Sequence, residues 1–290
     1  MKSQAIIIDT DVGDNIDDAL ALALAVNSPE FHLFGVTTVF RNAPRRAALT
    51  RYILDGLGQT STRVVAGVSK PLLQAYDFGL GAQFQILQDD VWDDTAHAVD
   101  FLIEQAHIDE EPDPDNLLTV VCISPLTNIA VAIVREPELI PRIRIVLMGG
   151  CWSRAEAETN IRSDPEAAAI VFNSGVEISM IGLDVTRRCE LAPAHLQQIA
   201  AASTRAAQML QQLITLWQDG TPRTPVLNDP LVVLSLFDDC ITWQDKCIEV
   251  ALCGEQRGCT FVGDGEPNAR VAMDVDAERA VELCLARLLT

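Results

Sequence analysis

Short apolar segments alternate with longer segments of helical periodicity along most of the chain. Segments rich in Val and Ile predict buried strands, and they lie at 6–8, 34–40, 63–66, 117–122, 143–147, 177–181 and 271–275. The longer segments predict helices at 43–57, 97–106, 194–217 and 277–289. Alternating strands and helices are typical of α/β proteins. We therefore expect an open, mostly parallel sheet with helices on both faces, in a single domain that spans residues 1–290.

The first predicted strand runs directly into a turn that is rich in carboxylates. Ile6-Ile7-Ile8 is followed by Asp9-Thr10-Asp11, the chain turns at Gly13, and Asp17-Asp18 begin an apolar helix. Open α/β sheets bind their ligands at the carboxyl ends of their strands. A simpler interpretation of the carboxylates is that they cap the helix, but a helix cap needs only one acidic residue. Four carboxylates so close together repel one another, and a hard divalent cation such as Ca²⁺ would stabilise them.

Two further stretches stand outside the main alternation. Residues 73–94 have no regular period and carry the aromatic side chains of Tyr76 and Trp92. A long loop of this kind beside an α/β sheet favours a lid or the mouth of a pocket. Residues 246–252 and 260–262 are predicted to form a small β element near the end of the chain.

Composition and charge exclude several kinds of partner. The net charge of −20 disfavours nucleic acid and anionic membranes, because phosphate groups require basic surfaces. No apolar run approaches the length of a membrane span, and no signal peptide is visible before the first strand. The eight cysteines contain no C-x-x-C pair, so we expect all of them to be reduced. Together these features predict a cytoplasmic protein with no nucleic acid and no membrane as partner.

Many sequence blocks, in one order along nearly the whole chain, resemble the nucleoside hydrolases, the inosine–uridine-preferring nucleoside N-ribohydrolases. The blocks are Asp9-Thr10-Asp11 with Asp17-Asp18-Ala19, Thr37-Thr38-Val39 with Asn42, Pro125 to Ala130, Leu147 to Gly150, Glu158 to Asn160, Asp164 to Ala168, Gly182 to Thr186, and Asp229-Pro230. Such a series is far more specific than one acidic motif. The resemblance implies a Rossmann-like nucleoside hydrolase fold and a hydrolase of nucleoside salvage, a glycosidase that acts on N-glycosyl compounds.

The resemblance also implies a metal and a catalytic base. A Ca²⁺ ion at the bottom of the pocket would be bound by the carboxylates of Asp11, Asp18 and Asp229 and by the main-chain carbonyl of Ile123. Asp11 would also accept the proton of the attacking water. The expected reaction is calcium-dependent hydrolysis of the N-glycosidic bond of a ribonucleoside or close analogue, which releases base and ribose. A homodimer or homotetramer is implied as well.

The substrate contacts follow from the same resemblance. Asp17 would accept a hydrogen bond from the 2′-hydroxyl, Asn42 and Asn160 would hold other ribose hydroxyls, and Glu158 would face the 5′-hydroxyl. Trp217 lies near the position where the family places aromatic side chains that contact the base. Trp152 and the loop from Tyr76 to Trp92 are further candidates, although plain core packing is an equally good interpretation of each Trp.

Three departures from the family pattern bear on the chemistry. The turn before Asp17 is two residues longer than usual, which makes Asp14 a competing ligand candidate. The loop from Met148 to Asn160 is shorter than usual, so the 5′ end is expected to be more open or to carry a different substituent. Asn228 replaces the family's His, the proposed proton donor to the leaving base, and an amide cannot supply a titrating proton. Ribosides whose base departs easily should therefore be preferred.

Two other hypotheses remain open at this point. A phosphatase of the haloacid dehalogenase type also begins with a strand and Asp-x-Asp, but Val12-Gly13 matches only half of its next requirement and a phosphate-binding Lys is not evident. The third hypothesis is a catalytically weak nucleoside-binding or regulatory homologue that keeps fold and metal without the acid at Asn228. Turnover of ribosides with good and poor leaving groups would separate it from the hydrolase.

Overall fold

The central feature of the fold is a sheet of eight strands, with spatial order β3-β2-β1-β4-β5-β6-β10-β7. The computed structural model describes residues 3–73, 81–87, 92–108, 117–219 and 223–290. The sheet strands are β1 (Gln4–Thr10), β2 (Phe31–Thr38), β3 (Arg63–Ala66), β4 (Leu118–Ile123), β5 (Ile143–Met148), β6 (Glu177–Ile181), β7 (Ile241–Lys246) and β10 (Ala269–Val275). All neighbouring pairs are parallel except β10 and β7. The predicted α/β class with a mostly parallel open sheet is confirmed.

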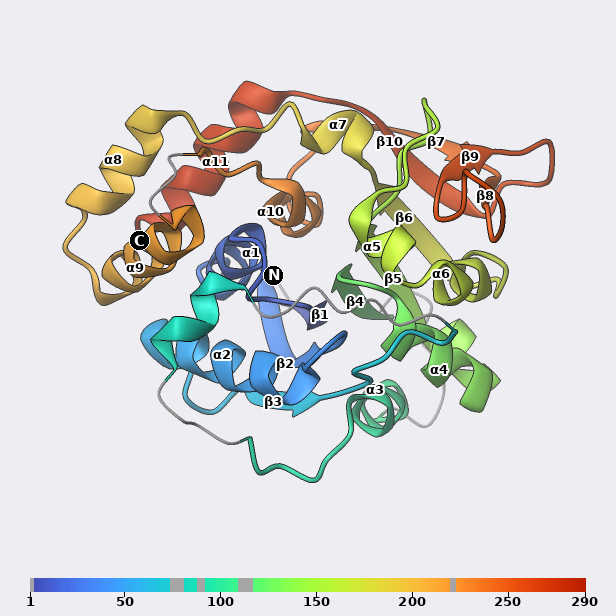
Figure 1. Ribbon diagram of the computed structural model, residues 1–290, viewed down its shortest axis with the longest axis horizontal. Coiled ribbons are helices and arrows are strands. Elements are labelled where there is room, and N and C mark those ends of the chain that lie inside the picture. The colour runs from blue at the N-terminus through green and yellow to red at the C-terminus, as the bar shows by residue number, and fades with distance from the viewer. Residues whose placement is uncertain (1–2, 74–80, 88–91, 109–116, 220–222) are drawn as a thin grey trace.

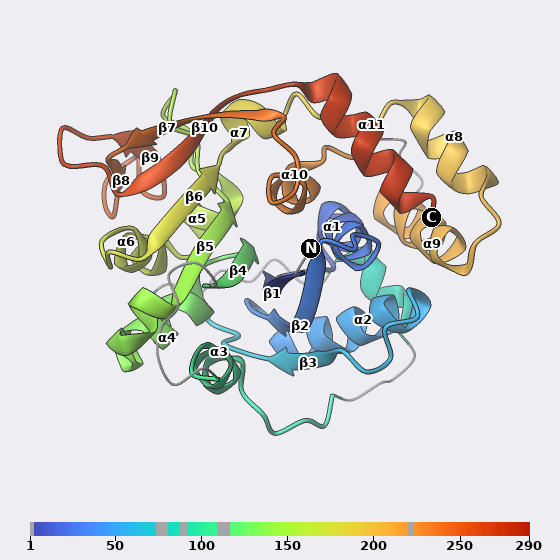
Figure 2. The same cartoon turned by 180° about the vertical axis from the view of Figure 1, so that it is seen from behind.

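Helices cover both faces of this sheet (Figures 1 and 2). They are α1 (Asp17–Val26), α2 (Ala43–Gly56), α3 (Ala98–Ala106), α4 (Thr127–Arg135), α5 (Thr159–Ser163), α6 (Pro165–Phe172), α7 (Leu183–Thr186), α8 (Pro193–Ala201), α9 (Arg205–Gln218), α10 (Asn228–Leu234) and α11 (Ala277–Leu288). One apolar core joins α1, α2, α9, α10 and α11 to the sheet, and a second joins α3, α4 and α6 to the other face. No helix in the described parts of the chain is long and apolar enough to cross a membrane.

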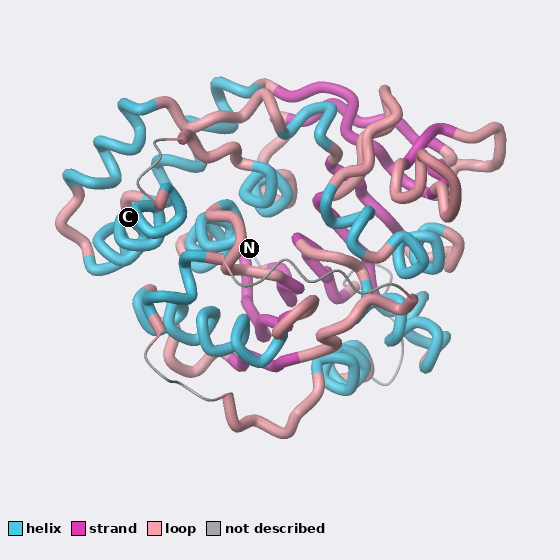
Figure 3. Tube along the Cα trace, viewed as in Figure 1, coloured by secondary structure: helices cyan, strands magenta, loops and turns pink. Residues whose placement is uncertain are grey.

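Most predicted elements lie where the pattern of the sequence places them, and the differences have local causes. The helical stretch at 194–217 is two helices, α8 and α9, because the chain is extended at Ala202. The second predicted strand ends at Thr38 rather than Phe40, because Phe40 and Arg41 adopt left-handed backbone angles, with φ of 70° and 54°. The tube in Figure 3 shows helices and strands alternating along the chain.

The end of the chain was predicted only in part. The small β element is present as β8 (Ile248–Val250) paired with β9 (Thr260–Val262). The sequence analysis missed β7, which joins the sheet as an antiparallel edge strand beside β10. Its burial pattern is mostly open to solvent, so it lacks the apolar run by which the other strands were found. Of the predicted lid, residues 74–80 and 88–91 lie outside the described part, and two short helices, η1 (Ala82–Ile86) and η2 (Pro137–Arg142), complete the fold.

The topology places a ligand site between β1 and β4. The chain leaves β1 for β2 and β3 on one side of the sheet and then returns to β4 on the other side. The loops after β1 and β4 therefore separate, and a crevice forms at the carboxyl edge of the sheet. Such switch points are where open α/β sheets bind their ligands. Thr10 at the end of β1 pairs with Ile123 at the end of β4, which sets the bottom of that crevice.

Candidate active site

The turn that follows β1 is held from below by a buried arginine. Arg46 on α2 is fully buried. Its Nε donates to the carbonyl of Phe40 at 2.9 Å, and its Nη1 donates to the carbonyls of Asp11 and Val12, the latter at 2.9 Å. Its Nη2 forms an ion pair with Asp14 at 2.8 Å. One guanidinium thus fixes both the acidic turn and the strained segment after β2, since its five N–H groups form a rigid fork.

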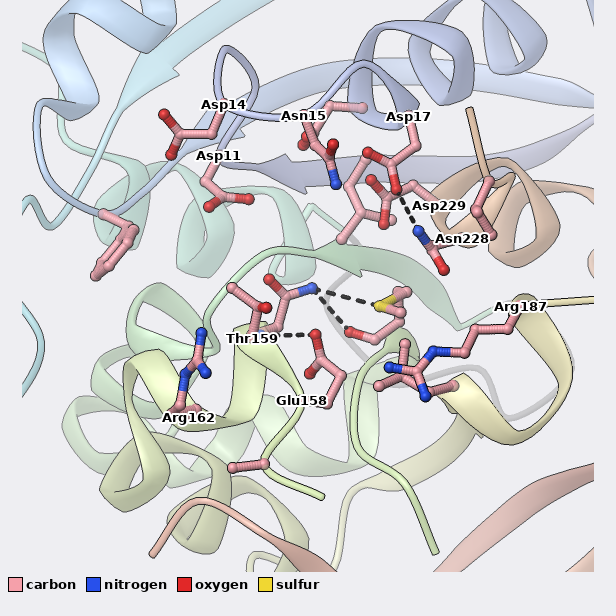
Figure 4. Close-up of a pocket in the computed structure, with 18 of the residues that line it drawn as sticks. Asp11, Asp14, Asn15, Asp17, Glu158, Thr159, Arg162, Arg187, Asn228 and Asp229 are labelled. Atoms are coloured by element: carbon pink, nitrogen blue, oxygen red, sulfur yellow. Dashed lines mark hydrogen bonds between the residues drawn. The ribbon is translucent and has the colours of Figure 1, made fainter. Parts of the chain in front are cut away.

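Three carboxylates meet at the amino ends of α1 and α10. Oxygen atoms of Asp17, Asp18 and Asp229 all lie within 4.8 Å of one another, and all three side chains are buried. Thr10 Oγ1 donates to Asp18 at 2.6 Å, and Asn228 Nδ2 donates to Asp17 Oδ2 at 2.8 Å. The second oxygen of Asp17 is buried and has no hydrogen-bond partner among the described residues. Figure 4 shows Asp17 and Asp229 side by side, with Asn228 next to them.

Burial and mutual repulsion dominate the electrostatics of this cluster. Burial raises the pKa of Asp17 to about 6. Burial, reinforced by the neighbouring carboxylates, raises the pKa of Asp18 and of Asp229 well above the ordinary value. Burial also raises the pKa of Asp11 to about 7, although the charge of Arg46 lowers it. Like charges in a medium of low dielectric favour either protons or a bound cation.

The opposite side of the site is built by the loop after β5. Glu158 begins the short helix α5, and its buried carboxylate accepts hydrogen bonds from the backbone N–H groups of Gly150, Asn160 and Ile161 at 2.8–3.1 Å. Burial raises the pKa of Glu158 despite those bonds. The side chain of Asn160 donates to the carbonyl of Met148 at 3.1 Å. Both predicted sugar contacts are therefore fixed by the backbone.

These two sides enclose a cavity of about 470 Å³ at the switch point, which is in the range of small-molecule sites. The described residues that line it are Asp11, Asp14, Asn15, Asp17, Asp18, Phe40, Arg41, Ile123, Met148, Glu156, Ala157, Glu158, Thr159, Asn160, Arg162, Leu183, Arg187, Val226, Asn228 and Asp229. The fold thus brings together the residues predicted for the catalytic base and the metal, and three of the four predicted for the sugar, from four different loops. Figure 4 shows several of them around the cavity.

Two predicted site residues do not reach the cavity. Asn42 is exposed and caps α2, where its side chain accepts from the N–H of Arg45 at 3.1 Å. Trp217 is buried and lies outside the cavity lining, and its Nε1 donates to Asn15 Oδ1 at 3.0 Å. Its link to the site is therefore indirect, through Asn15. Trp152, also outside the lining, donates from Nε1 to a carbonyl of β10.

The longer turn supplies a cavity residue that the sequence analysis did not single out. Asn15 is exposed in the cavity lining, with its backbone carbonyl bound by Gln83 at 2.5 Å and its amide oxygen bound by Trp217. Its Nδ2 is thereby left to face the cavity. The two-residue insertion before Asp17 was the only signal in the sequence. Asp14, the competing ligand candidate, is instead paired with Arg41 and Arg46.

Several other blocks that carry the family resemblance are structural. Asn128 joins Asp9 to the carbonyl of Thr38, at 2.7 and 3.1 Å. Asp164 caps α6. Asp184 accepts from the backbone N–H groups of residues 152 and 153 and so orders the loop after β5. These side chains fix the loops that carry the site without lining the cavity themselves.

The donor set fits a hard divalent cation. It offers only oxygen atoms, it is buried, and one oxygen of Asp17 lacks a partner in the described structure. Carboxylate and carbonyl oxygens are the ligands that Ca²⁺ and Mg²⁺ prefer. The compact group includes two predicted metal ligands, Asp18 and Asp229, and also Asp17, which was assigned to ribose. Asp11 and Ile123 line the same cavity, so their metal contacts stay a prediction.

Fold and site together define an α/β enzyme with a carboxylate-lined pocket at the switch point of its sheet. Comparison with known proteins makes the assignment specific. Residues 6–282 match the model of the inosine-uridine preferring nucleoside hydrolase family. The chain belongs to this family and is a nucleoside hydrolase, and the phosphatase hypothesis is thereby excluded.

Individual relatives cover nearly the full length of the chain. A non-specific ribonucleoside hydrolase of Salmonella paratyphi A is 36% identical over an alignment of 300 positions that covers 94% of each chain. The probable uridine nucleosidase 2 of Arabidopsis thaliana is 31% identical over 321 residues, with 98% of this chain and 97% of that protein covered. The solved structure of a plant nucleoside hydrolase superposes with a TM-score of 0.87 at 26% identity and covers 100% of both chains.

Proposed function

We propose that this protein is a calcium-dependent nucleoside N-ribohydrolase, formed by a single catalytic domain that spans residues 1–290. It hydrolyses the N-glycosidic bond of a ribonucleoside or close analogue and releases base and ribose. The observation that supports the proposal most directly is the buried group of Asp17, Asp18 and Asp229 at the switch point of a chain that matches the family over nearly its whole length.

Asp11, Asp18 and Asp229 would hold the ion, with the backbone carbonyl of Ile123. Asp17 adjoins the same group. When bound, the cation supplies Lewis acidity to oxygen atoms at the bottom of the cavity. Calcium is the proposed ion because Ca²⁺ accepts many oxygen ligands in flexible geometry. The oxygen atoms here come from three segments: the turn from β1 into α1, the end of β4 and the start of α10.

The side chains of the cavity would perform the remaining chemistry. Asp11 accepts the proton of the attacking water at its carboxylate, which lines the cavity. Breaking the bond between C1′ and the base nitrogen produces an oxocarbenium-like state, as in the hydrolysis of O-glycosides. The surrounding carboxylates stabilise this positive charge because they are already oriented toward it.

The sugar would be held from both sides of the cavity. Asp17 has one oxygen fixed by Asn228 and one unpartnered oxygen, which can accept from the 2′-hydroxyl. Glu158 and Asn160 face it from α5 and bind the other end of the ribose. Asn42 and Trp217 are not part of this proposal, because they lie outside the cavity lining.

The experiment that tests the proposal measures ribose released from inosine and from uridine, together with the metal content of protein purified without chelator. We expect calcium in the protein and loss of turnover when it is verifiably removed. Asp11→Asn should lower kcat by at least about 10²-fold, the smaller end of the contribution of a general base. Asp55→Asn, a partly exposed carboxylate on α2, is the control.

Two results would contradict parts of this proposal. Activity that persists after calcium removal would refute the metal assignment. Tight nucleoside binding without release of ribose from either substrate would instead favour the nucleoside-binding homologue.

We also propose that the protein is cytoplasmic and forms a homodimer or homotetramer. All eight cysteines are free thiols, which agrees with a reducing compartment. Oligomers are common among soluble enzymes, and light scattering on the purified protein measures the mass directly. A monomeric mass would contradict this part of the proposal.

A further inference from the structure

The side chain of Asn228 lines the cavity, and its amide oxygen is a hydrogen-bond acceptor without a partner among the described residues. Its Nδ2 donates to Asp17 Oδ2 at 2.8 Å, whereas its Oδ1 is buried and has no partner among the described residues. In Figure 4 this oxygen points away from Asp17. An amide has no titrating proton to give to a departing base. Asn228, which precedes Asp229 in the chain and binds Asp17, therefore accepts hydrogen bonds without supplying a titrating proton.

Among the described residues that line the cavity, no other side chain offers a titrating N–H acid in place of the family's His. The lining contains no His, Lys, Tyr or Cys among the residues that the structure describes. The four histidines lie elsewhere, at positions 32, 97, 107 and 195. The arginines that line the cavity stay protonated at all accessible pH values. A neutral riboside therefore receives no proton from position 228 or from these arginines when its base leaves.

The charge of the cavity is strongly negative. Seven carboxylates line it, against three guanidinium groups. Two of the carboxylates already have arginine partners, since Asp14 pairs with Arg41 and Glu156 pairs with Arg187. The other five are Asp11, which is half-buried, and the buried Asp17, Asp18, Glu158 and Asp229. A divalent cation and the remaining guanidinium group, that of Arg162, offset three of those charges when all five are ionised. The remaining negative charge favours a positively charged substrate.

We propose that the preferred substrates are cationic N-ribosides, whose ring nitrogen carries a positive charge at the glycosidic bond. This inference rests on the proposed N-ribohydrolase function and names its substrate class. Pyridinium ribosides and N7-alkylated purine ribosides belong to the class. A leaving ring with an amino or carboxamide group also provides the donor that Asn228 Oδ1 lacks.

The reaction of such a substrate is balanced without a proton donor. The bond between C1′ and the ring nitrogen breaks, and its electron pair goes to that nitrogen and cancels the positive charge. The base leaves as a neutral molecule. Water adds its oxygen to C1′ and loses one proton, first to a carboxylate of the cavity and then to solvent. The products are ribose, the neutral base and one proton.

The test compares 7-methylinosine with inosine, in mildly acidic buffer where the methylated ring keeps its positive charge. Methylation at N7 both adds the charge and blocks protonation at that atom. Because the methylated compound is also more labile in water, each kcat/KM is divided by the spontaneous hydrolysis rate constant in the same buffer. We expect this rate enhancement to be at least about tenfold larger for 7-methylinosine, since several carboxylates lie near the charge.

A substitution at Asn228 tests the cause. Asn228→His adds a proton donor, so it should raise the enhancement for inosine and leave that for 7-methylinosine nearly unchanged or lower. Asn173→His, the same replacement on the exposed end of α6, is the matched control and should leave both values unchanged. Retained hydrolysis of 7-methylinosine by Asn228→His shows that the variant is folded.

The outcomes separate the two proposals. An enhancement for inosine that equals or exceeds that for 7-methylinosine in the parent enzyme overturns the inference, while N-ribohydrolase function stands. Release of ribose from neither compound, nor from uridine, refutes the N-ribohydrolase function itself.

Discussion

Replacing Arg46 should destabilise the protein strongly, although this residue touches no substrate. The side chain is fully buried and serves four acceptors: the carbonyls of Phe40, Asp11 and Val12 and the carboxylate of Asp14. Arg46→Met keeps much of the apolar stem but removes every donor. Three backbone carbonyls then lose this donor, and Asp14 keeps Arg41 as its partner.

The magnitude follows from the burial of those groups. Each buried acceptor that loses its donor costs about 1–3 kcal/mol, and such costs add incompletely within one network. Asp14 is 30% exposed at its side chain, so water replaces part of what its carboxylate loses. Because Asp14 also keeps Arg41, the three carbonyls account for most of the effect. We expect the free energy of unfolding to fall by about 3–5 kcal/mol.

Urea denaturation measures this change, provided that the slope of the free energy of unfolding against urea concentration is the same in all variants. Arg45→Met, at the exposed neighbouring position of α2, is the matched control and should stay within about 0.5 kcal/mol of the parent. Arg46→Lys should fall between the two, because an ammonium cannot reproduce the planar fork. A loss for Arg46→Met no larger than that for Arg45→Met would refute the argument.

Three further changes test other parts of the structure. Gly13→Ala should lower the thermal unfolding temperature and cost about 1–3 kcal/mol, because φ is +126° and the new Cβ would lie 2.4 Å from an aromatic ring. Trp217→Phe should lower kcat/KM by up to about tenfold while the fold is kept, because Asn15 loses one hydrogen bond; an unchanged kcat/KM would show that Asn15 needs no such support. Glu166→Gln should cost at most about 1 kcal/mol at neutral pH. The Arg257 partner lowers the pKa of Glu166, so the ion pair stabilises the fold fully above the ordinary pKa of 4.5. This stabilisation should disappear as the pH falls through the lowered pKa of Glu166, which urea denaturation at several pH values measures. A cost of Glu166→Gln that does not depend on pH would contradict the role of this ion pair.

The sequence predicted the parallel sheet because each central strand is buried on both faces. β1, β4 and β5 are nearly continuous runs of Val, Ile and Leu, and such runs are readable without tertiary information. The carboxylates after β1 could be predicted in the same way, because they follow the strand within a few residues of sequence. The antiparallel edge strand β7 was missed because its stability comes from pairing with β10 rather than from its own pattern.

What the sequence determined by itself is therefore the class of fold, the carboxylate edge and the family. Only the tertiary structure decided which carboxylates meet. Asp18 and Asp229 are 211 residues apart in the chain and come together where α1 packs against α10. It also decided that Trp217 contacts the site through its hydrogen bond to Asn15, and that Arg46 binds the backbone of the turn after β1. Such contacts depend on how helices pack across the sheet, and no periodicity along the chain encodes that packing.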